Sequence, residues 1–107
     1  MACSHDATIF FSAKPQDVYN AFLKALPLLD TRLVIESQNP TALQIHAKIP
    51  LSMTYNPTAI HVMLGNTQDG GTSAFVSSNY TIPAMVDWGR NKKIVNKLVA
   101  TVNAILS

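Results

Sequence analysis

The sequence is poor in charge and holds a single cysteine. Only 13% of its 107 residues are charged while 48% are apolar, which is the opposite of a disordered composition. One cysteine, Cys3, excludes an internal disulfide framework and any multi-cysteine metal site. No apolar run approaches the roughly 18 residues of a membrane-spanning helix. We therefore predict one soluble domain over residues 1–107, with residues 1–7 flexible and no membrane contact.

The sequence also lacks the motifs of the common enzyme classes. It contains no Gly-x-Ser-x-Gly, no His-Glu-x-x-His, no phosphate loop, no Gly-x-Gly-x-x-Gly and no Cys-x-x-Cys. Its six carboxylates are scattered, and Cys3 has no identifiable partner that would activate it as a nucleophile. We predict a protein without catalytic residues and without a cofactor.

The first residues carry no basic stretch followed by an apolar one, so we see no signal peptide and expect a cytoplasmic location. An alternative is that Ala2, Cys3 and Ser4 are the remnant of a lipoprotein cleavage site whose upstream part was removed.

The clearest element is the C-terminal segment of residues 87–106. At 100° per residue its apolar side chains fall within one arc of roughly 140°, which predicts a long helix with one buried face. Asp87 is the predicted N-terminal cap, because its carboxylate can accept hydrogen bonds from the free N–H groups of the first turn. The predicted apolar arc contains Trp88, Ile94, Val95, Leu98, Val99, Val102, Ile105 and Leu106.

The rest of the chain predicts one strand, one helix and four further strands. Residues 8–13 are a short β-prone run, and a helix is expected from Pro15 until Pro27 ends or distorts it. Residues 51–58 contain two turn-forming residues, so we interpret them as a loop whose Met53 and Tyr55 fold back onto the core. The later strands, separated by turns at 39–41 and 69–71, are expected at residues 32–38, 42–49, 59–66 and 72–81.

This order predicts a two-layer α+β domain with both helices on the same face of the sheet. The other face would then meet solvent or a partner. By strand alternation this outer face should carry an apolar set that a monomer exposes, which predicts a homodimer through the sheet face, with edge pairing as the alternative. The set is Phe10, Val34, His46, Met63 and Phe75.

The element order resembles the TATA-box-binding-protein-like and Bet v 1/START-like group, in which a curved antiparallel sheet wraps a long C-terminal helix. The run Asp87-Trp88-Gly89-Arg90-Asn91-Lys92-Lys93, preceded by the Gly70-Gly71-Thr72 turn, also looks like small bacterial proteins of uncharacterised role. The resemblance implies a curved antiparallel sheet and a bacterial source. DNA bending is not implied, because the chain has no second repeat.

Our leading hypothesis is a noncatalytic small-ligand-binding or interaction module. Its cleft would lie between the long helix and the sheet and would hold a small apolar ligand. The simpler alternative is that the same side chains only fill the core. The candidate ligand-binding residues are Tyr19, Phe22, Tyr55, Trp88 and Leu98.

The second hypothesis is an anion or nucleic-acid site at the start of the last helix. Residues 87–107 carry four basic residues against one aspartate, a net charge of +3, whereas the remaining chain has a net charge of −1. Free N–H groups at a helix start attract anions, although the cations can equally be solvated. Nucleic acid is the less expected partner, because no aromatic residues interleave with the basic ones. The candidate anion-binding residues are Gly89, Arg90, Lys93 and Lys97.

Two histidines, His46 and His61, are expected on the wetter face of neighbouring strands, opposite or diagonal to each other. Two imidazoles can share a metal ion, but neither strand supplies a third ligand. We therefore predict no metal site.

Overall fold

The computed structural model describes residues 4–51, 56–82 and 89–107. Its element order agrees with the predicted order of one strand, one helix, four strands and one helix, with one added 3-10 turn. The elements are β1 (Ser4–Phe11), α1 (Pro15–Ala25), η1 (Leu26–Leu28), β2 (Val34–Asn39), β3 (Gln44–Ile49), β4 (Thr58–Asn66), β5 (Thr72–Tyr80) and α2 (Arg90–Leu106).

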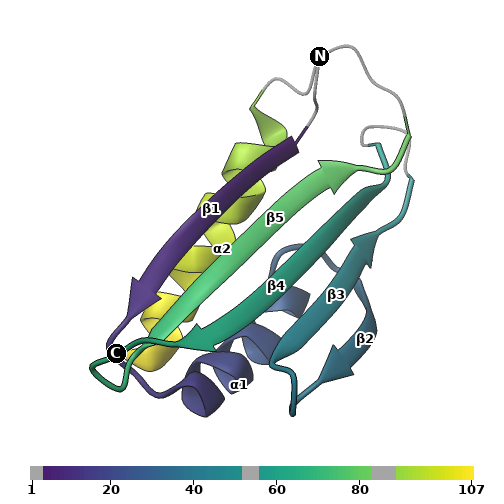
Figure 1. The fold of residues 1–107 in the computed structure, drawn as a ribbon. Coiled ribbons are helices and arrows are strands. Elements are labelled where there is room, and N and C mark those ends of the chain that lie inside the picture. Colours follow the sequence, from purple (N-terminus) through teal and green to yellow (C-terminus); the bar gives the residue numbers. More distant parts are fainter. Residues whose placement is uncertain (1–3, 52–55, 83–88) are drawn as a thin grey trace.

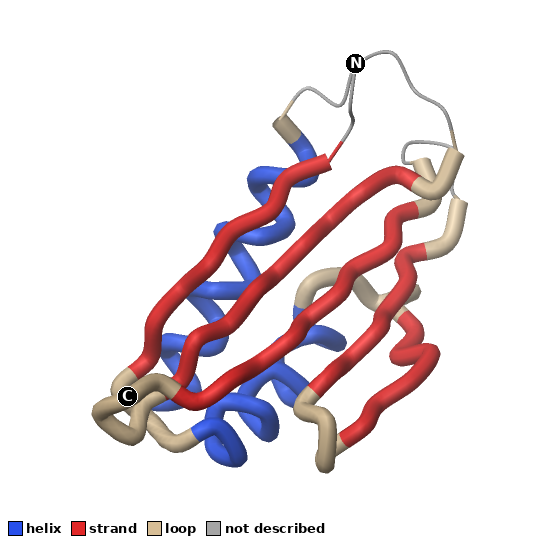
Figure 2. The backbone as a smooth tube through the Cα atoms, viewed as in Figure 1, coloured by secondary structure: helices blue, strands red, loops and turns tan. Residues whose placement is uncertain are grey.

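The five strands form one antiparallel sheet in the order β1-β5-β4-β3-β2. Both helices cover the same face of this sheet, and the opposite face is bare (Figure 1; Figure 2). The helix α2 packs against β1, β5 and α1, while α1 packs against β4 and β5. The predicted two-layer α+β architecture is confirmed. Among the described residues no helix is both long enough and apolar enough to cross a bilayer.

The first strand is longer than predicted. It begins at Ser4, so residues 4–7, which we expected to be flexible, pair with β5 from Val76 to Asn79. The prediction failed because residues 4–7 are held by a partner strand some 70 positions away, and local β-propensity carries no trace of that pairing. Residues 1–3 lie outside the described part of the chain.

The first helix begins at Pro15 as predicted. Proline suits this position because its fixed φ fits the helix and its missing N–H has no helical partner there. The helix passes into the 3-10 turn that contains Pro27. Its apolar face is buried in the core, with Val18, Tyr19, Ala21, Phe22 and Ala25 at most 2% exposed.

The last helix begins three residues later than predicted. Gly89 occupies the N-cap position with φ 75°, a left-handed conformation that costs glycine little. Capping of the first turn by the Asp87 carboxylate stays a prediction. Asp87 and Trp88 lie outside the described residues, as do Met53 and Tyr55. Of the described residues in the predicted apolar arc, Val95, Leu98 and Val102 are buried, and Ile94, Val99 and Leu106 are half-buried. Ile105 in the last turn is 36% exposed.

The core fills the space between the helices and the inner face of the sheet. Strand alternation is regular: Ile60, Val62 and Leu64 of β4 point inward, while His61 and Met63 point outward. Phe11 and Phe22 meet edge to face with ring centroids 6.1 Å apart. Such a pair adds about 1 kcal/mol to the burial of the two rings.

Candidate functional site

Three of the predicted ligand-binding residues lie in the layer between the helices and the sheet. Tyr19 and Phe22 come from α1 and Leu98 from α2, and all three are at most 2% exposed. They belong to one continuous apolar cluster. The other two, Tyr55 and Trp88, lie outside the described residues, so the ligand-binding set stays a prediction.

The hydroxyl of Tyr19 is the one buried side-chain polar atom without a hydrogen-bond partner among the described residues. Burial removes the hydroxyl from water, and this desolvation raises its pKa above the ordinary value. An unpaired buried hydroxyl costs roughly 1–3 kcal/mol. A phenylalanine at this position would avoid that cost.

A second polar feature of the same layer joins α2 to the sheet. Asn91 of α2 and Ser78 of β5 are both fully buried, and the Ser78 hydroxyl donates to Asn91 Oδ1 at 2.8 Å. Asn91 lies on the face of α2 that also buries Val95, Leu98 and Val102. The pair therefore forms a hydrogen bond inside a mainly apolar layer and links α2 to β5 at one position.

At the predicted anion site, the side chain of Arg90 makes contacts within the fold. Arg90 Nη1 donates to Thr58 Oγ1 at 2.7 Å and to the carbonyl of Asn56 at 3.3 Å. Its guanidinium carbon also lies 5.6 Å from the centroid of the Tyr80 ring. These contacts hold Arg90 against the ends of β4 and β5. We call Thr58, Ser78, Tyr80, Arg90 and Asn91 the polar end of the helix–sheet layer.

The remaining anion-site candidates lie on the surface. Gly89 caps α2, and the side chains of Lys93 and Lys97 are exposed. The first turn of α2 contains no acidic residue. Whether an anion binds there stays a prediction.

The two histidines lie directly opposite each other on the outer face, as one of the two predicted registers requires. Their ring centroids are 4.3 Å apart with an interplanar angle of 60°. Desolvation lowers the pKa of His61, repulsion from His46 lowers it further, and Glu36 partly offsets both. Among the described residues no group of three or more potential ligands could hold a metal ion.

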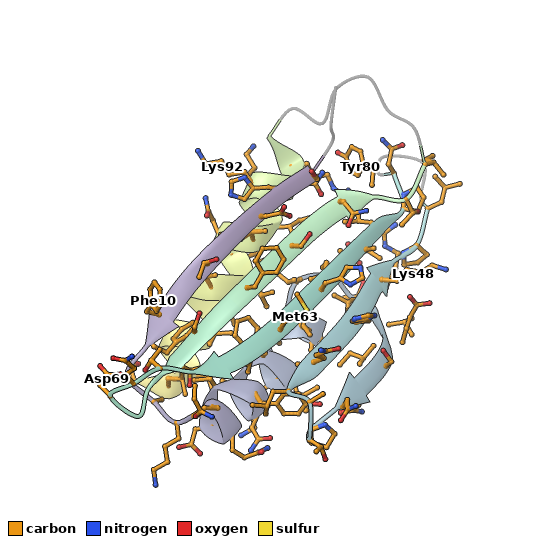
Figure 3. All side chains as sticks on the ribbon, viewed as in Figure 1. Phe10, Lys48, Met63, Asp69, Tyr80 and Lys92 are labelled. Carbon is orange, nitrogen blue, oxygen red and sulfur yellow. The ribbon has the colours of Figure 1, made fainter. Side chains whose placement is uncertain are left out.

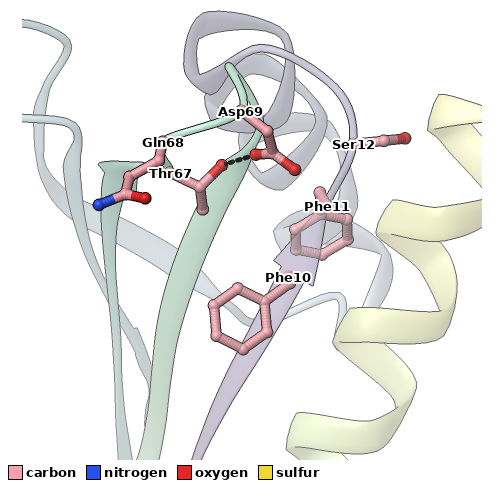
Figure 4. A pocket seen from close by; sticks show the side chains of 6 residues that line it. All are labelled: Phe10, Phe11, Ser12, Thr67, Gln68 and Asp69. Atoms are coloured by element: carbon pink, nitrogen blue, oxygen red, sulfur yellow. Dashed lines mark hydrogen bonds between the residues drawn. The ribbon is translucent and has the colours of Figure 1, made fainter.

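A surface hollow of about 570 Å³ lies where β1 ends beside the β4–β5 turn (Figure 4). None of the predicted site residues lines it. Its one carboxylate, Asp69, accepts hydrogen bonds from the Thr67 hydroxyl and the Gly71 N–H, which lower its pKa. The carboxylate of Asp69 thus stabilises the β4–β5 turn. The lining residues are Phe10, Phe11, Ser12, Thr67, Gln68 and Asp69.

The polar end was missed by our reading of the sequence, apart from Arg90. One signal was available for Asn91, since it lies four, seven and eleven positions before Val95, Leu98 and Val102, which is the spacing of a buried helical face. Ser78 carried the same kind of signal, because it alternates with Ala74 and Val76 on β5. Thr58 was assigned to a loop, and its burial depends on α2.

Comparison with solved structures identifies the fold. A protein from Nitrosospira multiformis is 13% identical, with a TM-score of 0.71 over 97% of this chain and 96% of the other. A START superfamily protein from Mycobacterium smegmatis is 10% identical, with a TM-score of 0.61 over 96% and 93%. The Zhui aromatase/cyclase from Streptomyces sp. R1128 is 10% identical, with a TM-score of 0.57 over 97% and 86%.

Identities this low show the fold alone, and that fold is Bet v 1/START-like, as the resemblance implied. The TATA-binding-protein part of the resemblance stays a prediction. No protein-family model and no curated protein matches the sequence.

Proposed function

We propose that the protein is a noncatalytic module that binds a small, mainly apolar ligand between α2 and the inner face of the sheet. The observation that carries the proposal is the buried Tyr19 hydroxyl, which has no partner among the described residues. Ligand sites combine an apolar lining with a few fixed polar groups, and the helix–sheet layer has both. The Bet v 1/START-like fold supports this choice, since it includes ligand-binding proteins.

In this proposal Tyr19 supplies the directional contact and the apolar cluster supplies the affinity. The hydroxyl would donate to a carbonyl or ether oxygen of the ligand. The side chains of Phe22 and Leu98 would contact its apolar part. One neutral hydrogen bond contributes about 1 kcal/mol, so the hydroxyl would select ligands with an oxygen at one position more than it would tighten binding overall.

The test uses the neutral naphthyl ketone prodan, whose fluorescence reports an apolar environment and whose carbonyl can accept a hydrogen bond. We expect saturable binding at one site, little changed by added salt because no ion pair is involved. Tyr19→Phe should weaken binding several-fold, with a free energy of unfolding equal to or above that of the wild type. A purely structural tyrosine would leave the affinity unchanged.

Leu28→Ser is the matched control, since Leu28 is 63% exposed and lies on η1. It should leave prodan affinity intact. If no saturable binding occurs, or if Tyr19→Phe binds prodan as the wild type does, the proposal for this layer is wrong.

The second candidate function is anion binding at the start of α2. It is favoured by the exposed Lys92, Lys93 and Lys97 together with a first turn free of acidic residues. Titration with inorganic phosphate and with a short single-stranded oligonucleotide tests it. Binding of this kind should weaken steeply with salt and be lost in the double variant Lys93→Glu/Lys97→Glu, whereas prodan binding should be insensitive to both changes.

A further inference from the structure

We propose that the outer face of the sheet binds a second copy of the chain face to face, about a two-fold axis that runs along the strands between β5 and β4. This inference does not depend on a ligand in the helix–sheet layer. The outer face exposes apolar side chains, of which Phe10 is 71% and Met63 42% exposed (Figure 3). Phe75, half-buried, is the direct cross-strand neighbour of Met63.

The outer face carries little charge on four of its five strands. On β1, β5, β4 and β3 its outward positions hold one acidic residue, Asp6, and one basic residue, Lys48, besides the two histidines. The other outward positions are serine, threonine, asparagine, glutamine, alanine, glycine, methionine and phenylalanine. The fifth strand, β2, adds the exposed Glu36, which acts on His61. A permanently solvated sheet face is normally richer in charge, and the centre of a protein interface is normally depleted in it.

The strand register shows that this face is complementary to itself. Outward residues form rows across the sheet, and one row runs Asp6, Ser77, His61, His46 while the next runs Thr8, Phe75, Met63, Gln44. Rotation about a two-fold axis that runs along the strands between β5 and β4 places each row of one copy over the same row of the second copy, with the residues of that row in reverse order. It therefore places β5 over β4 of the second copy and β1 over β3 of the second copy.

The resulting contacts match in size and in charge. Phe75 faces Met63 of the second copy, and Met63 faces its Phe75, which is a favourable sulfur–aromatic contact at the centre of the interface. Asp6 faces His46 of the second copy and lies diagonal to its Lys48, so the acidic position of one face meets the basic positions of the other. Small residues also meet, since Ser73 faces Gly65 of the second copy.

The area of the face also fits a stable dimer. Four strands at ~4.8 Å spacing and eight residues at ~3.4 Å rise give a projected face of about 500 Å². Side-chain relief raises the accessible area towards the ~800 Å² per partner of a standard interface. Stacked sheets of this kind pack ~10 Å apart with their strands within about 30° of each other, which leaves room for the Phe75 and Met63 side chains.

The test is a pair of charge variants whose effects cancel only in the proposed register. Met63→Lys and Phe75→Asp should each fold, as judged by circular dichroism, and each should weaken dimerisation at least about tenfold in sedimentation velocity. A mixture of the two should restore a dimer, because one of its two central contacts becomes Lys against Asp while the other remains Phe75 against Met63. Leu28→Lys, on an exposed residue far from this face, should dimerise as the wild type does.

Three outcomes would overturn the proposal: a wild-type monomer throughout the micromolar range, a dimer that survives both variants, as edge pairing would give, or a mixture that stays monomeric. A second measurement covers the case in which a charge variant does not fold. In a Cys3→Ser background, Met63→Cys and Phe75→Cys proteins should be joined by a short bis-maleimide cross-linker rapidly when mixed and slowly when kept apart. Equal rates would also overturn the register.

Discussion

The two faces of the sheet are built from the same strands, yet only one of them is a core. The inner face is covered by α1 and α2, and its Ile60, Val62 and Val76 are at most 1% exposed. The outer face carries Phe10 and Met63 (Figure 3) and the histidine pair. No helix or strand of the described chain covers this face (Figure 2). Apolar content alone therefore does not make a core: a second layer must cover it. Four predictions test this difference.

The largest contrast is between two phenylalanines. Phe22→Ala should lower the free energy of unfolding by about 3–5 kcal/mol, because it leaves a cavity beside Phe11 in the covered layer. Phe10→Ala should change it by less than ~1 kcal/mol, because the side chain is already largely in water. Urea unfolding at low protein concentration, where association contributes little, measures both. Equal losses would mean that the outer face is covered within the monomer.

The next contrast is between Ser78 on the inner face of β5 and Ser77 on its outer face. Asn91→Ala should lower the free energy of unfolding by about 2 kcal/mol, since it leaves the buried Ser78 hydroxyl without the acceptor that the structure shows. Ser77→Ala, one residue earlier on the outer face, should stay within ~0.5 kcal/mol. A double-mutant cycle of Ser78→Ala with Asn91→Ala should give a coupling of about 1 kcal/mol. Additive effects in urea unfolding would show that the hydrogen bond does not join α2 to β5.

Gly71 and Gly65 differ in the space that is available for a side chain. A Cβ on Gly71 would lie 2.5 Å from the backbone oxygen of Phe11, so Gly71→Ala should destabilise the fold by about 1–3 kcal/mol. A Cβ on Gly65, in the exposed part of β4, would meet nothing within 4 Å. Gly65→Ala should therefore be neutral or stabilise by about 0.5 kcal/mol, because it restricts the unfolded chain. Thermal unfolding of the two variants measures this, and the opposite order of melting temperatures would contradict it.

The smallest effect concerns His61 of the outer face. Its pKa in the folded state is lowered, mainly by desolvation and also by His46, so the unfolded state binds a proton more readily. The stability that the neutral imidazole contributes is present above the ordinary value of 6.5 and is lost as pH falls through the folded value. Urea unfolding across this range should show the loss in the wild type and a smaller loss in His61→Gln.

The neighbouring histidine tests the cause of the lowered pKa of His61. His46→Gln should raise the pKa of His61 in an NMR titration because it removes the repelling neighbour. An unchanged His61 pKa in His46→Gln would show that desolvation alone lowers it.

Most of the architecture could be predicted because it depends on local patterns. The alternation of apolar and polar residues in 59–66 predicts one strand with one solvent-facing side, and the structure buries the predicted apolar side. Pro15 predicted the start of α1 for an equally local reason. At residues 4–7 the predicted bounds were wrong because the deciding pairing joins segments some 70 positions apart. At the start of α2 the deciding residue is Gly89, whose left-handed conformation the helical periodicity does not reveal. The candidate site was predicted less well, because Ser78 and Asn91 become a pair only when α2 lies on β5.

The order of the residues already establishes which segments can be strand or helix and which side of each is apolar, because those properties follow from the periods of 2 and 3.6 residues. Which apolar side is covered depends on how the elements pack against one another. The described residues form two α-helices, and both lie on one face of the five strands. That choice buried Tyr19 with its hydroxyl, brought Arg90 to Thr58, and left Phe75 and Met63 on a face that a second copy can cover.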